Sequence, residues 1–144
     1  MKASIIFENI WCDSDVVELK IIVDDGASKF TNTVYATYMQ IENIVSGLDI
    51  FKEHIYGGIF DLELGKYGSE YANGAFYGRL HFNERGKIFI SVNQQTDFFD
   101  FGRKNVAGEA TLYVISEPAL LNNFISQFRM IDKEIGSKAY LECI

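Results

Sequence analysis

The chain of 144 residues is poor in proline, cysteine and histidine, with one, two and two of these residues respectively. Because it has a single proline and no low-complexity linker, nothing marks a second domain, and this length fits one domain spanning residues 1–144. Cys12 and Cys143 lie near opposite ends of the chain. Two free thiols, as in a cytoplasmic protein, are favoured over a disulfide between them.

Long apolar runs are also missing. The first apolar run is short and is broken by Glu8 and Asn9. A signal peptide needs a longer apolar core, and a membrane span needs about 20 apolar residues. We therefore expect a cytoplasmic protein that does not associate with membranes.

Positive charge is in short supply, with 13 Lys and Arg against 20 Asp and Glu, which gives a net charge of −7. Such a surface repels nucleic acid, whose binding depends on cations that meet phosphates. It suits a basic protein partner, because opposite charges speed association. Acidity that serves solubility alone is the alternative.

The usual catalytic and metal-binding patterns are missing as well. The only histidines, His54 and His81, have no cysteine or second histidine at metal-ligand spacing. The sequence has no G-x-S-x-G nucleophile motif. We expect no catalytic residue, no bound metal and no cofactor.

Two pairs of carboxylates are the remaining candidates for chemistry. Asp61 and Glu63 share the outward face of an expected strand, and Asp97 and Asp100 bracket an aromatic run. Paired carboxylates can transfer protons or hold a hard cation. Ordinary solvated acids are the favoured interpretation here.

What the sequence does contain is alternation of apolar and polar residues. Val17, Leu19 and Ile21 share one face of a stretch whose other face is charged, which is typical of a half-buried strand. Similar patterns predict strands at 4–10, 16–25, 29–37, 58–65, 75–82, 87–94 and 108–115. The clearest hairpin joins 75–82 to 87–94 through the turn 83–86. It should bury Phe76, Leu80, Phe82, Ile88, Ile90 and Val92.

Two segments have helical spacing instead. The first begins at Tyr38, after a capping box of Thr37 and Gln40, and is expected to end at residues 56–58. The second is expected to be capped by Ser116 and to end at Gly136. The tail, residues 137–144, is either a short strand or a docked end.

The order of these elements is β-β-β-α-β-β-β-β-α. Strands joined by short turns pair antiparallel, and helices then cover one face of the sheet. We predict an α+β fold with a curved, mainly antiparallel sheet of about six or seven strands and two helices packed against it.

One stretch, residues 64–80, is rich in glycine and tyrosine. A phosphate-binding loop would lead into a helix, whereas this stretch leads into a strand, so its glycines are predicted to serve turns and bulges. Tyr67 and Tyr71 either anchor a partner or cover an edge of the core. A second aromatic run contains Phe98, Phe99 and Phe101, for which a core edge covered by a helix is favoured over a partner contact.

The pattern of elements combines the early strands with a helix within "YMQIENIVSGLDIFKEHI", the strand "FDLELG" and the closing segment "EPALLNNFISQF". This pattern resembles small immunity proteins of bacterial polymorphic-toxin and contact-dependent inhibition systems, including the WapI-type group. The resemblance covers about residues 16–130. It implies a cytoplasmic, non-catalytic protein that neutralises a cognate toxin domain, often a nuclease, by tight binding.

The leading hypothesis is therefore an acidic surface that faces a basic toxin domain. Its expected contact residues are Asp61, Glu63, Tyr67, Glu70, Tyr71, Asp97 and Asp100. A second hypothesis is a small-molecule or peptide site on the concave sheet face with Tyr77, Arg79 and His81. A third is a homodimer formed through the phenylalanine run.

Overall fold

The computed structural model describes residues 2–83 and 86–144. Their fold is α+β, as predicted, with two helices and ten strands in antiparallel sheets. The strands exceed the predicted number and form two four-stranded sheets and a separate hairpin where one curved sheet was expected.

The two larger sheets are called here sheet A and sheet B. Sheet A contains, in spatial order, β10 (Lys138–Glu142), β1 (Ser4–Cys12), β2 (Val16–Asp24) and β3 (Lys29–Thr37). Sheet B contains β4 (Ile59–Leu64), β5 (Ala75–Phe82), β6 (Ile88–Gln95) and β9 (Glu109–Ser116). The hairpin is formed by β7 (Phe99–Phe101) and β8 (Lys104–Val106), and the helices are α1 (Tyr38–Phe51) and α2 (Pro118–Phe128).

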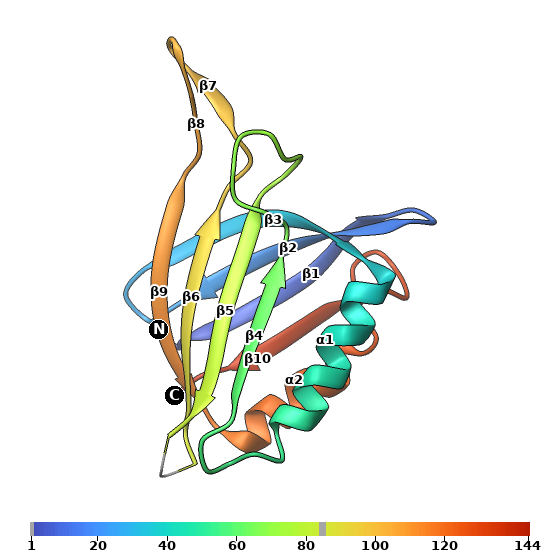
Figure 1. Ribbon diagram of the computed structural model, residues 1–144, viewed down its shortest axis with the longest axis vertical. Coiled ribbons are helices and arrows are strands. Elements are labelled where there is room, and N and C mark those ends of the chain that lie inside the picture. Colours follow the sequence, from blue (N-terminus) through green and yellow to red (C-terminus); the bar gives the residue numbers. More distant parts are fainter. Residues whose placement is uncertain (1, 84–85) are drawn as a thin grey trace.

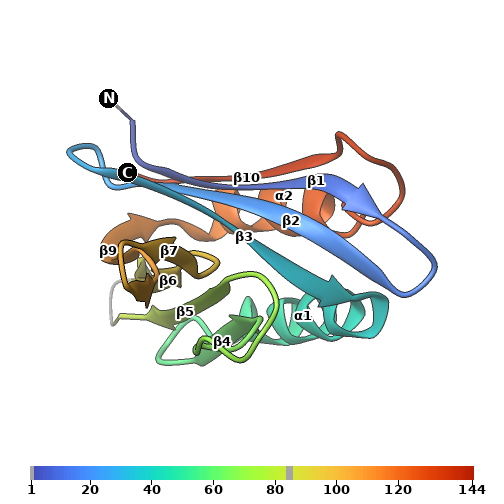
Figure 2. The same ribbon diagram turned by 90° about the horizontal axis from the view of Figure 1, so that it is seen from above.

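Sheet A lies behind sheet B in the view of Figure 1, with α1 and α2 beside sheet B. Seen from above, sheet A extends over both sheet B and the helices (Figure 2). Phe7 of β1 lies where these parts meet, because its ring contacts Phe76 of sheet B at 5.5 Å and Phe124 and Phe128 of α2 at 5.6 and 5.4 Å. One core therefore serves both sheets and α2.

Alternation along the strands sets which side chains enter that core. Val17, Leu19 and Ile21 are fully buried, while the residues between them are only partly buried. All six side chains predicted to be buried in the hairpin of β5 and β6 are buried. Of the predicted turn, Glu84 and Arg85 lie outside the described residues, and Gly86 has the left-handed φ of +75° that favours glycine.

The first helix begins as predicted. The backbone N–H of Gln40 donates to Thr37 Oγ1 (3.1 Å), and the N–H of Thr37 donates to Gln40 Oε1 (2.8 Å). The predicted end at 56–58 is wrong, since α1 ends at Phe51. The Phe51 ring stacks on Phe82 at 4.7 Å, and the chain then turns back to enter β4.

The second helix differs from the prediction at both ends. Its N-cap is Glu117, whereas Ser116 ends β9 and donates through Oγ to the Glu142 carbonyl oxygen at 2.6 Å. The helix stops at Phe128, and turns carry the chain to Gly136, whose N–H donates to the Asn9 carbonyl oxygen at 2.7 Å. The tail then forms β10, antiparallel to β1.

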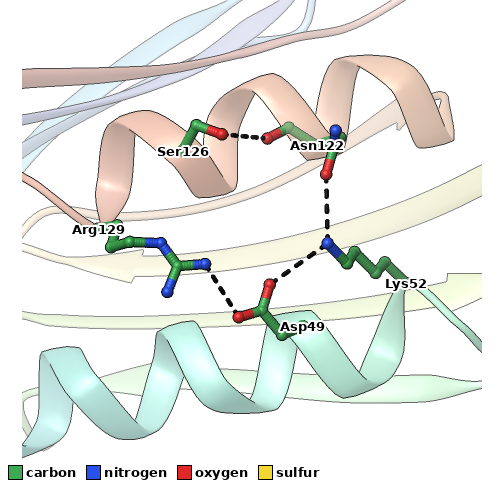
Figure 3. A network of polar contacts seen from close by, with 5 residues as sticks. All are labelled: Asp49, Lys52, Asn122, Ser126 and Arg129. Atoms are coloured by element: carbon green, nitrogen blue, oxygen red, sulfur yellow. Dashed lines mark hydrogen bonds and ion pairs between the residues drawn. The ribbon is translucent and has the colours of Figure 1, made fainter.

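A polar network joins the two helices (Figure 3). Arg129 donates to Asp49 Oδ2 (3.0 Å), and Lys52 contacts both Asp49 Oδ1 (3.5 Å) and Asn122 Oδ1 (3.3 Å). The hydrogen bond from Arg129 is the main cause that lowers the pKa of the Asp49 carboxyl. The network fixes the end of α1 against α2.

Both cysteines are free, as predicted. In the part of the chain that the structure describes, neither helix has the length and apolar character needed to cross a membrane.

Candidate functional site

The glycine- and tyrosine-rich connection between β4 and β5 folds against the edge of sheet A. The N–H of Gly74 donates to the Thr33 carbonyl oxygen at 3.0 Å. A Cβ atom at Gly74 would lie only 2.7 Å from that same oxygen, and Gly65 has a φ of +69°. These glycines therefore permit a close approach of two backbones and tight turns, in agreement with the sequence interpretation.

A buried polar cluster lies at the same junction of the sheets. Asn32 of β3 donates through Nδ2 to the carbonyl oxygens of Ala75 and Gln95, both at 2.9 Å. Gln94 in turn donates to Asn32 Oδ1 at 2.8 Å. Sequence reasoning missed this cluster, although amide side chains at inward positions of two alternating strands were a signal for it.

The face of sheet B that points away from sheet A carries most of the predicted site residues, and we call it the outer face of sheet B. It comprises Ile59, Asp61, Glu63, Tyr77, Arg79, His81, Phe89, Ser91, Asn93, Thr111, Tyr113 and Ile115. Ile59, His81, Phe89 and Ile115 are in register and form one row across all four strands. Tyr113 is 70% exposed and Ile59 is 60% exposed. A mostly apolar row with a neighbouring tyrosine is thus open to solvent.

The polar residues in the next row are paired with one another. Arg79 donates from Nε and Nη2 to the two carboxylate oxygens of Asp61, at 2.7 and 3.0 Å. The Tyr77 hydroxyl also donates to Asp61, at 3.1 Å. The hydrogen bond from Arg79 is the main cause that lowers the pKa of the Asp61 carboxyl. Asp61 and Arg79 thus present a closed ion pair, and His81 packs edge-on against Phe89 with centroids 5.6 Å apart.

Tyr67 reaches from the β4–β5 connection onto the outer face. Its hydroxyl donates to the carbonyl oxygen of Asn93, on the inner strand β6 of sheet B, at 2.8 Å. Burial, with Glu109 and Glu63 nearby, raises the pKa of the Tyr67 phenol to about 12. A cavity of about 260 Å³ lies here, lined by Tyr67, Tyr77, Asn93, Gln94, Glu109, Ala110 and Thr111.

The other predicted contact residues lie in two places away from this cavity. Glu70 is exposed in the β4–β5 connection, as is Tyr71, whose ring has Lys66 Nζ at 5.6 Å from its centroid. Asp97 precedes the β7–β8 hairpin and Asp100 lies within it.

The β7–β8 hairpin projects beyond the rest of the molecule (Figure 1). Phe99 and Phe101 are 52% and 70% exposed, and Phe98 is half-buried. The favoured interpretation of this run as a core edge covered by a helix is therefore wrong. The hairpin strands are too short for their pattern of polar and apolar residues to show, from sequence alone, that the hairpin leaves the body of the protein.

No family model, no curated protein sequence and no solved structure matches the chain. Among residues 2–83 and 86–144, no group of three His, Cys, Asp or Glu side chains is placed to hold a metal ion.

Proposed function

We propose that the chain is a non-catalytic immunity protein that binds a cognate toxin domain through the outer face of sheet B and thereby neutralises it in the cytoplasm. The observation that carries the proposal is the exposed row of Ile59, Phe89 and Ile115 with Tyr113 beside it. Exposed apolar patches with a polar rim are typical of sites that bind other proteins.

The shape of this face favours a macromolecule over a small ligand. Its side chains stand on four neighbouring strands of one sheet, and Phe89 and Ile115 are each 37% exposed. Small-molecule sites enclose most of the ligand in a concave pocket, whereas protein interfaces are broad and nearly flat. The Asp61–Arg79 ion pair adds a polar margin to the apolar row.

Charge favours a basic partner. The chain carries a net charge of −7, and Arg79 on the outer face of sheet B is already paired with Asp61. A toxin domain that acts on nucleic acid needs a cationic surface to bind phosphates. Opposite charge on the two proteins would speed their association and select against acidic proteins.

The test is to express the proteins encoded beside this chain, one at a time, in a bacterial host with and without the chain. We expect one of them to stop growth, growth to return when the chain is present, and the two purified proteins to form a stable complex. The proposal is overturned if no neighbouring product is toxic, or if a toxic one is not relieved by the chain.

A further inference from the structure

We propose that the cavity beneath Tyr67 receives a basic side chain, arginine or lysine, from the protein partner. This inference rests on the proposed function, because it takes the basic group from a bound protein. It adds the chemistry of one anchor contact to an interface that is otherwise defined by its apolar row.

The position of the cavity suits a single extended side chain. It has a volume of about 260 Å³ and opens on the outer face of sheet B, between Tyr67 and the strands β5, β6 and β9. The hydrogen bond from the Tyr67 hydroxyl to Asn93 fixes the Tyr67 ring, and Tyr77, beside Asn93 in the register, also lines the cavity. The floor is polar, since Thr111 Oγ1 donates to Asn93 Oδ1 at 2.7 Å.

The charge around the cavity is negative. Glu109 lines it, and Gln95 Nε2 donates to Glu109 Oε1 at 2.7 Å, which holds the carboxylate in place. Glu63 lies beside Tyr77 on β4. In the described part of the chain, neither Glu63 nor Glu109 has an ion-pair partner, so a bound cation would supply the missing positive charge.

Two tyrosine rings and a carboxylate select a cation over other groups. The faces of aromatic rings attract ammonium and guanidinium groups, and a carboxylate adds charge-assisted hydrogen bonds. An anion would be repelled by both glutamates, and a neutral side chain would gain neither contribution. Arginine fits best, because its planar guanidinium stacks on tyrosine while it donates to a carboxylate.

The experiment follows backbone amide chemical shifts while the full chain is titrated with N-acetyl-arginine amide. The control is N-acetyl-citrulline amide, which has nearly the same shape and no charge, at matched ionic strength. We expect the arginine compound to shift the amides of Asn93 and Thr111 in a saturable manner and the citrulline compound to leave them unchanged. Equal shifts with both compounds, or no shift with either, overturn the inference.

Two variants locate the binding. Glu109→Gln should weaken the arginine compound about threefold, in line with a partly exposed charge contact. Glu142→Gln, on sheet A, is the matched control and should have no effect. An equal loss of affinity for the arginine compound in both variants overturns the assignment to this cavity. An unchanged affinity in Glu109→Gln overturns it as well.

The outcome separates this inference from the proposed function. If the arginine compound does not bind but a toxin is neutralised, the immunity function stands and the anchor contact is wrong. If the compound binds at Glu109 but no neighbouring product is toxic, the cavity has the inferred chemistry, and the assignment of its ligand to a toxin is wrong.

Discussion

The outward faces of the two sheets are built by the same alternation but carry different side chains. Sheet A has Lys138, Glu8 and Lys20 in register across three strands, and a second row of Tyr140, Ile6 and Ile22 in which both isoleucines are only half-buried. Its exposed Trp11 and Tyr35 stand on either side of Glu18. Sheet B has a more exposed apolar row, in which Ile59, Phe89 and Ile115 are all exposed, and one closed ion pair. Its Glu63 and Glu109 have no ion-pair partner among the described residues. Interspersed charges are typical of a surface that faces water, whereas an apolar row with an acidic margin is typical of one that binds a protein.

The largest effects should arise inside the core, where the two sheets are equivalent. Leu19→Ala in sheet A and Leu80→Ala in sheet B should each lower the free energy of unfolding by about 2–5 kcal/mol, because each leaves a cavity in the shared core. Chemical denaturation measures the free energy of unfolding of both variants. A loss below about 1 kcal/mol in one variant would mean that the substituted leucine is not packed in the core as described.

A smaller loss is expected where the sheets are joined. Asn32→Ala removes three hydrogen bonds. It leaves the carbonyl oxygens of Ala75 and Gln95 without this donor and the Gln94 amide without this acceptor, so we expect about 1–3 kcal/mol of destabilisation. Thr31→Ala, at the exposed neighbouring position of β3, is the matched control. If the two variants are equally stable by urea denaturation, the buried amide cluster does not hold the sheets together.

The hydroxyl of Tyr67 should contribute less, about 0.5–1.5 kcal/mol at neutral pH, through its bond to Asn93. Its phenol has a pKa of about 12 in the folded chain, against about 10 in an unfolded one. Between these values the unfolded chain binds fewer protons, so the stability conferred by this group falls as the pH rises. Urea denaturation should show that the difference in free energy of unfolding between wild type and Tyr67→Phe becomes smaller from pH 8 to pH 11.

A difference in free energy of unfolding between wild type and Tyr67→Phe that stays constant from pH 8 to pH 11 would contradict the environment assigned to the Tyr67 phenol. Measurements of both proteins at neutral pH serve as the control for the hydrogen bond itself.

The smallest effect belongs to the helix network, which lies outside both sheets. Asp49→Asn should cost less than about 1 kcal/mol, because the ion pairs of Asp49 are partly exposed to solvent. The lowered pKa of Asp49 means that its contribution is present at neutral pH and is lost as the pH falls through the folded value. Thermal unfolding in low and high salt checks this, since a salt-independent difference would argue against an ionic origin.

Much of the fold could be predicted because burial follows alternation. The inward residues of β5 and β6 and the capping box at Thr37 depend on local patterns, and these predictions are confirmed. The division into two sheets could not be foreseen, because it depends on Asn32 and Gly74 meeting residues far away in the chain. The end of the second helix was predicted wrongly because apolar residues such as Ile131 continue the helical spacing. Ile131 is buried in the core, but it lies in a turn that follows the helix.

The candidate site was predictable only in part. Alternation placed Asp61, Glu63, Tyr77, Arg79 and His81 on outward faces, but it could not show that Asp61 and Arg79 neutralise each other. It also gave no sign that the neighbouring strands would set Ile59, Phe89 and Ile115 in one row, because register is a property of the folded sheet.

The most direct test of the binding face compares two tyrosines on opposite sides of the molecule. Tyr113 is 70% exposed on sheet B, and Tyr140 is 42% exposed on sheet A. The affinity of the neutralised toxin domain is measured by calorimetry for wild type, Tyr113→Ala and Tyr140→Ala. We predict at least about a tenfold loss for Tyr113→Ala and no change for Tyr140→Ala. An unchanged affinity for Tyr113→Ala, together with a loss for Tyr140→Ala, would contradict the assignment and place the interface on sheet A.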